Sequence, residues 1–289
     1  MHSNHPMLSR RAFIGAQALL LASLVGCGPA DEAPQADDAP ASPRSLDEIA
    51  GSGFVRVGIT SDDRPLGYIS MRGNYAGYDH YFSLFLATRL GVGEVRCVAI
   101  DPKERYEALL ANKVDVLLVG ASPDDEAGEG VAYVRPLYAQ RLCVVSPEAA
   151  VVDAADKLSG GELIVCEGTY AARYAECTWP DVALRRYETH TDTWRALEDG
   201  RGIGVLTDEV SGLSWVSGAE EPFVCGMLGI GDEHAVCPAI AAGQDDLYNA
   251  VDQAVKAFHK NKYGQKAYTD YIEKYVDSAE GVTFEVPEP

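Results

Sequence analysis

An alternation of strand-like and helix-like segments, repeated twice along the chain, limits the possible folds more than any other feature. Apolar runs of strand length are separated by segments whose apolar residues recur at helical spacing, and the connections are short. Such alternation indicates parallel strands joined by right-handed helical crossovers. The first series has strands at 54–59, 95–100 and 114–119 with helices at 79–90 and from 102, and the second has strands at 163–166, 182–187 and 203–206 with helices at 169–176 and 192–199.

Two extended stretches, Gln140–Ser146 and His234–Ala242, stand where the chain could cross between two such units. We therefore predict an α/β protein of two lobes joined by two hinge-crossing strands. The last part of the chain is expected to be helical, because Leu247, Val251 and Phe258 recur on one stripe. Ligands of such sheets bind at the carboxyl ends of the strands, so a cleft between the lobes is the expected site.

The first residues of the chain predict export. Arg10 and Arg11 precede an apolar run, Phe13–Val25, that is too short to span a bilayer comfortably. The segment around the two arginines resembles a bacterial twin-arginine signal, and Leu24-Val25-Gly26-Cys27 resembles a lipobox, whose cysteine is acylated after cleavage. The resemblance implies an extracytoplasmic protein anchored in the lipid bilayer of the cell membrane through Cys27. The alternative is a buried helix with an incidental cysteine.

Composition and charge indicate a disordered linker and limit the kinds of partner that the folded body can bind. Residues 28–52 are expected to form a disordered linker, because their first part is mostly Ala, Pro, Asp and Glu and offers little apolar surface to bury. A net charge of −20 argues against nucleic acid as a partner of the folded body and weakly favours a cationic ligand. No cofactor is expected, and a monomer is the default.

The cysteines suggest disulfides without specifying them. If Cys27 is acylated, six remain, and six thiols allow fifteen pairings. Cys166 with Cys177 is the preferred local pair, because a strand end and the helix packed against it can meet. Zinc is disfavoured, since the cysteines and histidines lack metal-ligand spacing, and several buried free thiols are the other alternative. The six are Cys97, Cys143, Cys166, Cys177, Cys225 and Cys237.

A series of motifs, each weak alone, resembles in its order the extracellular solute-binding family 3, the polar amino acid binding proteins of ABC importers. The similarity extends from Gly53 to Val276. It implies the type II periplasmic-binding-protein fold, closure of two lobes over a small polar ligand, and an ABC permease as partner. The motifs are Gly53–Ile59 with Pro65-Leu66-Gly67-Tyr68, Tyr75–Asp79, Leu109–Leu118, Glu167-Gly168-Thr169-Tyr170 and Leu206-Thr207-Asp208.

The resemblance also gives an expected division of the chain. The signal peptide occupies 1–27 and the linker 28–52. The first lobe is expected at 53–141 and 238–277, the second at 142–237, and a C-terminal tail at 278–289.

Four ligand-binding positions carry over from the family. Asp208 lies where the family's Asp accepts the ligand's α-ammonium group, although a simple helix cap is the alternative. Thr169 lies where a Thr and a helix N-terminus hold the ligand carboxylate. Gly120 and Ser122 lie where the first lobe binds ligand, and Ser122 could equally be an ordinary turn residue.

Departures from the family pattern bear on the ligand. The family usually has Thr-x-x-Arg after the third strand, with the Arg holding the carboxylate, but this chain has Ser122-Pro123-Asp124-Asp125-Glu126. Asp63 stands where an aromatic residue is usual. Either another cation substitutes, with Arg64 and Arg173 as candidates, or the ligand is a cationic amine without a carboxylate. Tyr68, Tyr78 and Tyr170 could offer aromatic faces to it, while the alternatives are a solvated acidic loop and plain core tyrosines.

Three classes of function follow. The favoured one is a lipid-anchored receptor that captures a small amino acid or amine and passes it to a permease. The second is an enzyme. A dehydratase-like enzyme on the same fold could use Glu167 or Asp208 as a carboxylate of raised pKa, and a separate enzymatic alternative would use Cys166, Glu167 and His190 as nucleophile, base and orienter. The third is a sensory or interaction lipoprotein that has kept the fold.

Overall fold

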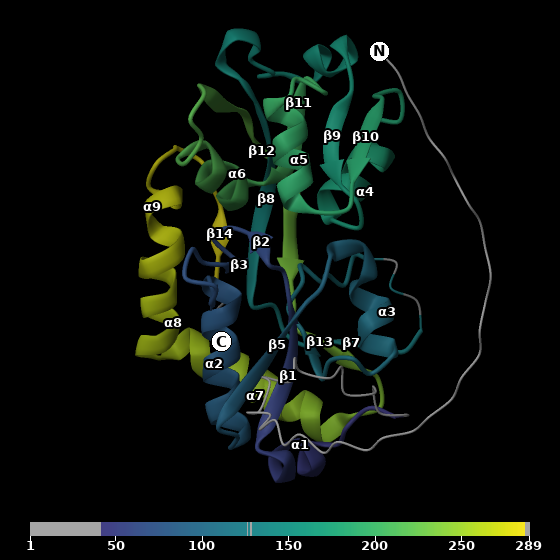
Figure 1. Ribbon diagram of the computed structural model, residues 1–289, viewed down its shortest axis with the longest axis vertical. Coiled ribbons are helices and arrows are strands. Elements are labelled where there is room, and N and C mark those ends of the chain that lie inside the picture. Colours follow the sequence, from purple (N-terminus) through teal and green to yellow (C-terminus); the bar gives the residue numbers. More distant parts are fainter. Residues whose placement is uncertain (1–41, 126, 128, 287–289) are drawn as a thin grey trace, which may run out of the picture. The chain divides into compact units, whose positions relative to one another are not determined.

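Two β-sheets form the frame of the fold in the computed structural model, which describes residues 42–125, 127 and 129–286 (Figure 1). The predicted signal peptide, Cys27 and most of the expected linker lie outside the described residues. The first sheet has the order β5-β1-β6-β13-β7, and its first three strands are parallel, as predicted. Its strands are β1 (Phe54–Ile59), β5 (Glu94–Ala99), β6 (Val116–Leu117), β7 (Val131–Tyr133) and β13 (Ala239–Ala241).

The second sheet has the order β10-β9-β11-β8-β12, and β14 pairs with β8 outside that path. Strands β10, β9 and β11 are parallel, whereas β8 runs antiparallel to both β11 and β12. A small third sheet has the order β2-β3-β4. The strands of these two sheets are β2 (Asp62–Asp63), β3 (Gly67–Ile69), β4 (Tyr75–Ala76), β8 (Tyr138–Pro147), β9 (Leu163–Cys166), β10 (Leu184–Tyr187), β11 (Gly204–Asp208), β12 (Phe223–Val236) and β14 (Phe284–Glu285).

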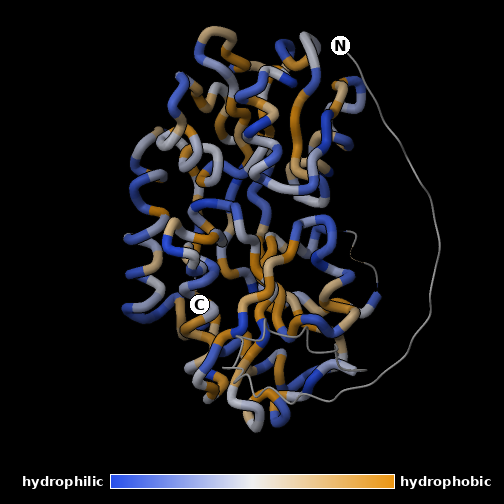
Figure 2. The backbone as a smooth tube through the Cα atoms, in the orientation of Figure 1, coloured by the Kyte–Doolittle hydropathy of each residue, from blue (hydrophilic) through white to orange (hydrophobic). Residues whose placement is uncertain are grey.

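Helices pack on both main sheets and bury apolar stripes. The predicted stripe of α7 is buried, with Leu247, Val251 and Phe258 in one core with residues of α2 and β1. Figure 2 shows hydrophobic residues along the strands of both sheets. The helices are α1 (Leu46–Ser52), α2 (Tyr78–Leu90), α3 (Arg105–Leu110), α4 (Tyr170–Thr178), α5 (His190–Glu198), α6 (Glu209–Val216), α7 (Asp245–Lys260), α8 (Lys262–Ala267) and α9 (Glu273–Val276), with short 3₁₀ turns at Pro102–Glu104, Glu148–Ala150 and Ala155–Gly160 and a π turn at Tyr268–Ile272.

The chain crosses between the two sheets twice, as the sequence predicted. It leaves the first sheet between β7 and β8 and returns between β12 and β13. The two crossings are held together by backbone hydrogen bonds from Val134 N to Pro238 O (2.9 Å) and from Leu137 N to Val236 O (2.8 Å). The first crossing therefore lies a few residues before the predicted stretch at 140–146, which is part of β8. We call the first-sheet side the first lobe and the second-sheet side the second lobe.

The prediction of a disordered linker over residues 28–52 is wrong for its last part. Residues 46–52 form α1, because Ser45 and Glu48 make a capping box and Ile49 is fully buried. The expected tail also contains structure, since Phe284 of β14 stacks on Tyr138 with ring centroids 4.7 Å apart. No described helix is long and apolar enough to cross a membrane.

The preferred disulfide is also wrong. All six cysteines in the described part of the chain are free thiols. Cys166 is buried at the end of β9, where its thiol donates to the carbonyl of Glu188 at 3.6 Å. Cys177 is exposed near the far end of α4, about 10 Å along the helix from Tyr170 at a rise of about 1.5 Å per residue. The helix therefore separates the two thiols.

Candidate functional site

A small cavity of about 30 Å³ lies between the lobes, where the parallel strands of both sheets end. It receives residues that follow β1, β5 and β6 from the first lobe and β9, β10 and β11 from the second. This is the position where α/β sheets bind ligands, because loops and helix N-termini converge there. The lining residues are Thr60, Asp63, Pro102, Arg105, Val119, Gly120, Thr169, Tyr170, His190, Asp208, His234 and Val236.

Asp63 supplies a buried carboxylate from the first lobe. The hydroxyl of Ser211 donates to Asp63 Oδ1 at 2.6 Å, and His190 Nε2 lies 3.9 Å from Asp63 Oδ2. Only 8% of the residue is exposed, and this burial raises the pKa of Asp63 to about 6. A cation placed beside the carboxylate would favour its charged form.

Asp208 supplies a second carboxylate from the end of β11. It occupies the N-cap position of α6, but its side chain turns to His234, with Asp208 Oδ1 3.0 Å from His234 Nε2. The ring of Tyr170 stacks on His234 with centroids 4.0 Å apart. The helix-cap alternative therefore does not account for the direction of this carboxylate.

Arg105 supplies the cation of the site, from the first turn of α3. Only 3% of it is exposed. Its guanidinium donates to Pro102 O at 2.6 Å, to Asp125 Oδ2 at 2.7 Å, and across the lobes to the carbonyl of Gly168. Its Nε is buried and has no hydrogen-bond partner among the described residues. Asp125, which stands in a loop where the family resemblance would place an arginine, thus pairs with an arginine from α3.

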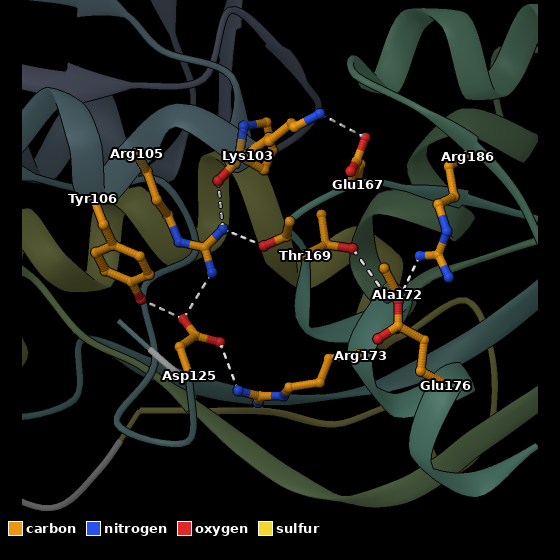
Figure 3. A pocket seen from close by; sticks show the side chains of 12 residues that line it. Lys103, Arg105, Tyr106, Asp125, Glu167, Thr169, Ala172, Arg173, Glu176 and Arg186 are labelled. Carbon is orange, nitrogen blue, oxygen red and sulfur yellow. Dashed lines mark hydrogen bonds and ion pairs between the residues drawn. The ribbon is translucent and has the colours of Figure 1, made fainter. Parts of the chain in front are cut away.

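A second, open hollow of about 560 Å³ adjoins the cavity and shares Pro102, Arg105 and Thr169 with it (Figure 3). Ion pairs cross or border it, between Lys103 and Glu167 (3.1 Å), Arg173 and Asp125 (3.1 Å), and Arg186 and Glu176 (2.5 Å). Oppositely charged side chains therefore alternate along its wall.

The two lobes approach closely beside this hollow. Gly168 has a φ of +81°, and a Cβ there would lie 2.5 Å from the Cα of Lys103, so a side chain would force the lobes apart. Another contact crosses between the lobes next to the lining residues Asp63 and His190, where Thr191 N at the start of α5 donates to Asp62 Oδ2 at 2.7 Å. Direct polar contacts thus hold the lobes together around the cavity.

Five of the eight predicted ligand-binding residues line the cavity, and three lie elsewhere. The lining ones are Asp63, Gly120, Thr169, Tyr170 and Asp208. Tyr78 is 1% exposed and packs edge-on against Tyr138, so it is a core residue. The ring of Tyr68 is covered by the guanidinium of Arg64, 4.0 Å from its centroid. Ser122 is a buried turn residue whose N–H donates to Asp125 Oδ2 at 2.9 Å.

The two arginines that were predicted to replace the family's carboxylate-binding Arg do not line the small cavity. Arg64 stacks on Tyr68, and Arg173 lines the open hollow, so neither lines the small cavity. Sequence reasoning missed Arg105, His234 and Thr60, and considered His190 only as part of an enzyme. Arg105 and His190 lie five and three residues after the predicted strands 95–100 and 182–187. Their place beyond the carboxyl end of a strand was the signal available in the sequence.

The proposed enzymatic set is not assembled. Burial raises the pKa of the Cys166 thiol well above its ordinary value, which disfavours a nucleophilic role. Glu167 is engaged with Lys103 at the open hollow, and His190 faces Asp63. Within residues 42–125, 127 and 129–286, no group of three His, Cys, Asp or Glu side chains is placed to hold a metal ion.

The sheets, the two crossings and the cavity define a two-lobed binding protein with the type II periplasmic-binding-protein fold. The solute receptor for L-cysteine of Neisseria gonorrhoeae superposes with a TM-score of 0.77, at 27% identity, covering 83% of this chain and all of that one. A cysteine-binding protein from Campylobacter jejuni gives 0.76 at 27% identity, covering 83% of this chain and 99% of its own.

Sequence comparison gives the family. The model of the bacterial extracellular solute-binding proteins, family 3, matches residues 55–274, and the chain belongs to this family. The L-cystine-binding protein TcyJ of Escherichia coli is 23% identical over 223 residues, which cover 75% of this chain and 81% of that protein. The match to the E. coli lysine/arginine/ornithine-binding periplasmic protein, 25% identical over 162 residues, spans 54% of this chain and 61% of the relative.

Proposed function

We propose that this protein is an extracytoplasmic, lipid-anchored receptor that encloses one small amino acid between its lobes and delivers it to an ABC permease, acting as a monomer without a cofactor. One observation carries the proposal. An interlobe cavity brings carboxylates from both lobes, Asp63 and Asp208, together with a buried arginine, Arg105. A zwitterion presents the two charges that such a site can hold.

The ammonium group is assigned to the acidic end of the cavity. Asp208 would accept a charge-assisted hydrogen bond, which is about twice as strong as a neutral one. The cation would further favour the charged form of Asp63, and Tyr170 would cover the ligand from the second lobe. His234 already lies 3.0 Å from Asp208, so a bound ammonium would compete with its imidazole for that oxygen.

The carboxylate is assigned to Arg105 and the start of α4. The other nitrogens of the Arg105 guanidinium donate to Asp125 and to two backbone carbonyls. Its Nε is buried and has no partner among the described residues, so it can donate to a ligand carboxylate. Thr169 caps α4 by accepting from Ala172 N at 3.2 Å, so the positive end of that helix faces the cavity. These two features would share the role of the arginine that this chain lacks at position 125.

Ligand entry would require the lobes to separate. A cavity of about 30 Å³ has room for about two water molecules and is too small for an amino acid. The ligand would then replace direct contacts between the lobes, and the permease would read the closed form.

A cationic amine is the second candidate. Asp125 neutralises Arg105, so the acids at the other end of the cavity leave it negative on balance. The relatives named above are described as binding cysteine, cystine, or lysine, arginine and ornithine, and this favours an amino acid.

A thermal-shift screen of the chain beginning at Gly28, against amino acids, amines, polyamines and small dipeptides, tests the proposal. A ligand at about 100 times its dissociation constant adds about 2.7 kcal/mol, which raises the melting temperature by roughly 5 to 10 °C. A shift with an α-amino acid supports the zwitterion site, and a shift only with carboxylate-free cations supports the amine. If neither class moves the melting temperature, the proposal fails.

Lipid anchoring is tested separately. The full chain expressed in its exporting host should enter the detergent phase of a Triton X-114 separation, because an acylated Cys27 adds lipid chains to a protein of net charge −20. Cys27→Ala should remain in the aqueous phase. Equal partitioning of the two proteins would contradict the anchor without affecting the ligand site.

A further inference from the structure

Gln140 is a fully buried polar residue close to the point where the chain enters the second lobe. It lies in β8, and its exposed fraction is 0%. Neither its carboxamide oxygen nor its carboxamide nitrogen has a hydrogen-bond partner among the described residues. Burial of a polar group without a partner destabilises a protein, so this carboxamide calls for a functional reason.

The second sheet places Gln140 next to the lining of the interlobe cavity. Gln140 pairs with His234 of β12 on one side and with Phe284 of β14 on the other. Residues that pair directly in an antiparallel ladder lie on the same face of the sheet, with Cβ atoms about 5 Å apart. His234 lines the cavity and Gln140 does not, so the carboxamide lies one strand behind the lining.

The neighbours of Gln140 along β8 agree with this position. Tyr138, two residues before it, packs in the core that includes α2 and α7, and Leu142, two residues after it, packs in the core of the second lobe. Both side chains lie on the same face of β8 as Gln140, because side chains alternate along a strand. Leu142 also pairs with Asp208 of β11. Gln140 thus interrupts an apolar series at the level of the site.

His234 has a second unused hydrogen-bonding atom at the same place. Its Nε2 lies 3.0 Å from Asp208 Oδ1, while its Nδ1 is buried and has no partner within the described part of the chain. The proposed ammonium position already requires this imidazole to give up Asp208. Its displacement would open the way from the cavity to the carboxamide of Gln140.

We propose that Gln140 and His234 bind the side chain of the enclosed amino acid, and that this side chain carries a group that both donates and accepts hydrogen bonds. The inference rests on the proposed function, in which Asp208 and Arg105 hold the ammonium and carboxylate groups of the ligand. It adds the chemical class of the side chain, which is polar and uncharged.

The hydrogen-bonding capacity of the two residues gives this class. A carboxamide offers two N–H donors and one acceptor oxygen, and the free nitrogen of a neutral imidazole adds one donor or one acceptor. A hydroxyl, a thiol or a carboxamide on the ligand can meet both kinds of group. An apolar side chain would leave them unpartnered, and a charged one would lose its hydration where the nearby acids are already engaged by the ammonium group.

Isothermal titration of the purified full chain with amino acids of matched shape tests the proposal. Threonine is compared with valine, asparagine with leucine, and both serine and cysteine with α-aminobutyrate. The polar member of at least one pair should bind at least about 10-fold more tightly than its apolar partner. Equal affinities within every pair overturn this proposal and leave the proposed function standing, whereas failure of every amino acid to bind overturns both.

Gln140→Met gives a second readout, because methionine is of similar length and apolar. The variant should bind both members of the preferred pair within about threefold of each other. Its ligand-free melting temperature should not fall below that of the matched control Gln253→Met, at an exposed position of α7, which should keep the preference. A preference that persists in Gln140→Met overturns the proposal. If this variant fails to fold, the comparison of ligand pairs on the wild-type chain decides.

Discussion

Arg105→Met is expected to lower the free energy of unfolding by about 2 to 4 kcal/mol, because it leaves the buried carboxylate of Asp125 without its closest cation. The side chains of Arg105 and Asp125 are 4% and 6% exposed. Asp125 would retain Ser122 N, the Tyr106 hydroxyl and Arg173, which keeps the loss below that of an isolated buried charge. Urea denaturation of wild type and variant measures the difference.

Arg173→Met is the matched control, because Arg173 also pairs with Asp125 but its side chain is 24% exposed. Its loss should be about 1 kcal/mol or less. The double variant Arg105→Met/Asp125→Asn should recover part of the stability lost in Arg105→Met, since it removes the unpaired charge. Equal losses for Arg105→Met and Arg173→Met would show that burial does not distinguish the two pairs.

Asp208→Asn is expected to weaken binding of the best ligand from the thermal-shift screen about 5- to 30-fold. The substitution keeps the size of the side chain but replaces a charge-assisted hydrogen bond to the ligand's ammonium group, worth about 2 to 3 kcal/mol, with a neutral one worth about 1 kcal/mol. Isothermal titration at constant pH measures the change. The stability of the ligand-free protein should change little, because the Asp208 side chain is 24% exposed.

Asp181→Asn controls for the loss of one negative charge from the second lobe. Asp181 is exposed in a turn between α4 and β10, away from the cavity lining. The affinity of the Asp181→Asn variant for the ligand should stay within about twofold of wild type, since exposed charges at a distance from the site are screened. An affinity for Asp208→Asn as high as that of Asp181→Asn would refute the assignment of the ammonium group to Asp208.

Both predictions concern a charge arrangement that the family pattern alone would not give. An acid, Asp125, stands where relatives of this family are expected to carry arginine, and an arginine from α3 fills the space beside it. Arg105 therefore keeps one cation beside Asp125, at this end of the cavity.

The sequence by itself determined the class of fold and the edge of the sheets where the site lies. Hydrophobic periodicity and the short connections are local properties, so strands such as β1 and β9 and the α7 stripe could be read directly. Asp208 and Thr169 were found because each ends or follows a strand in a recognisable motif.

Only the tertiary structure decided which side chains meet. Arg105 and Asp125 are 20 residues apart, and Asp208 and His234 meet from two strands of the second sheet, β11 and β12. Tyr78 is a core residue because α2 packs against α7 and β14, which follow much later in the chain. Such contacts depend on sheet order, register and helix rotation, which long-range packing sets and local sequence patterns do not encode.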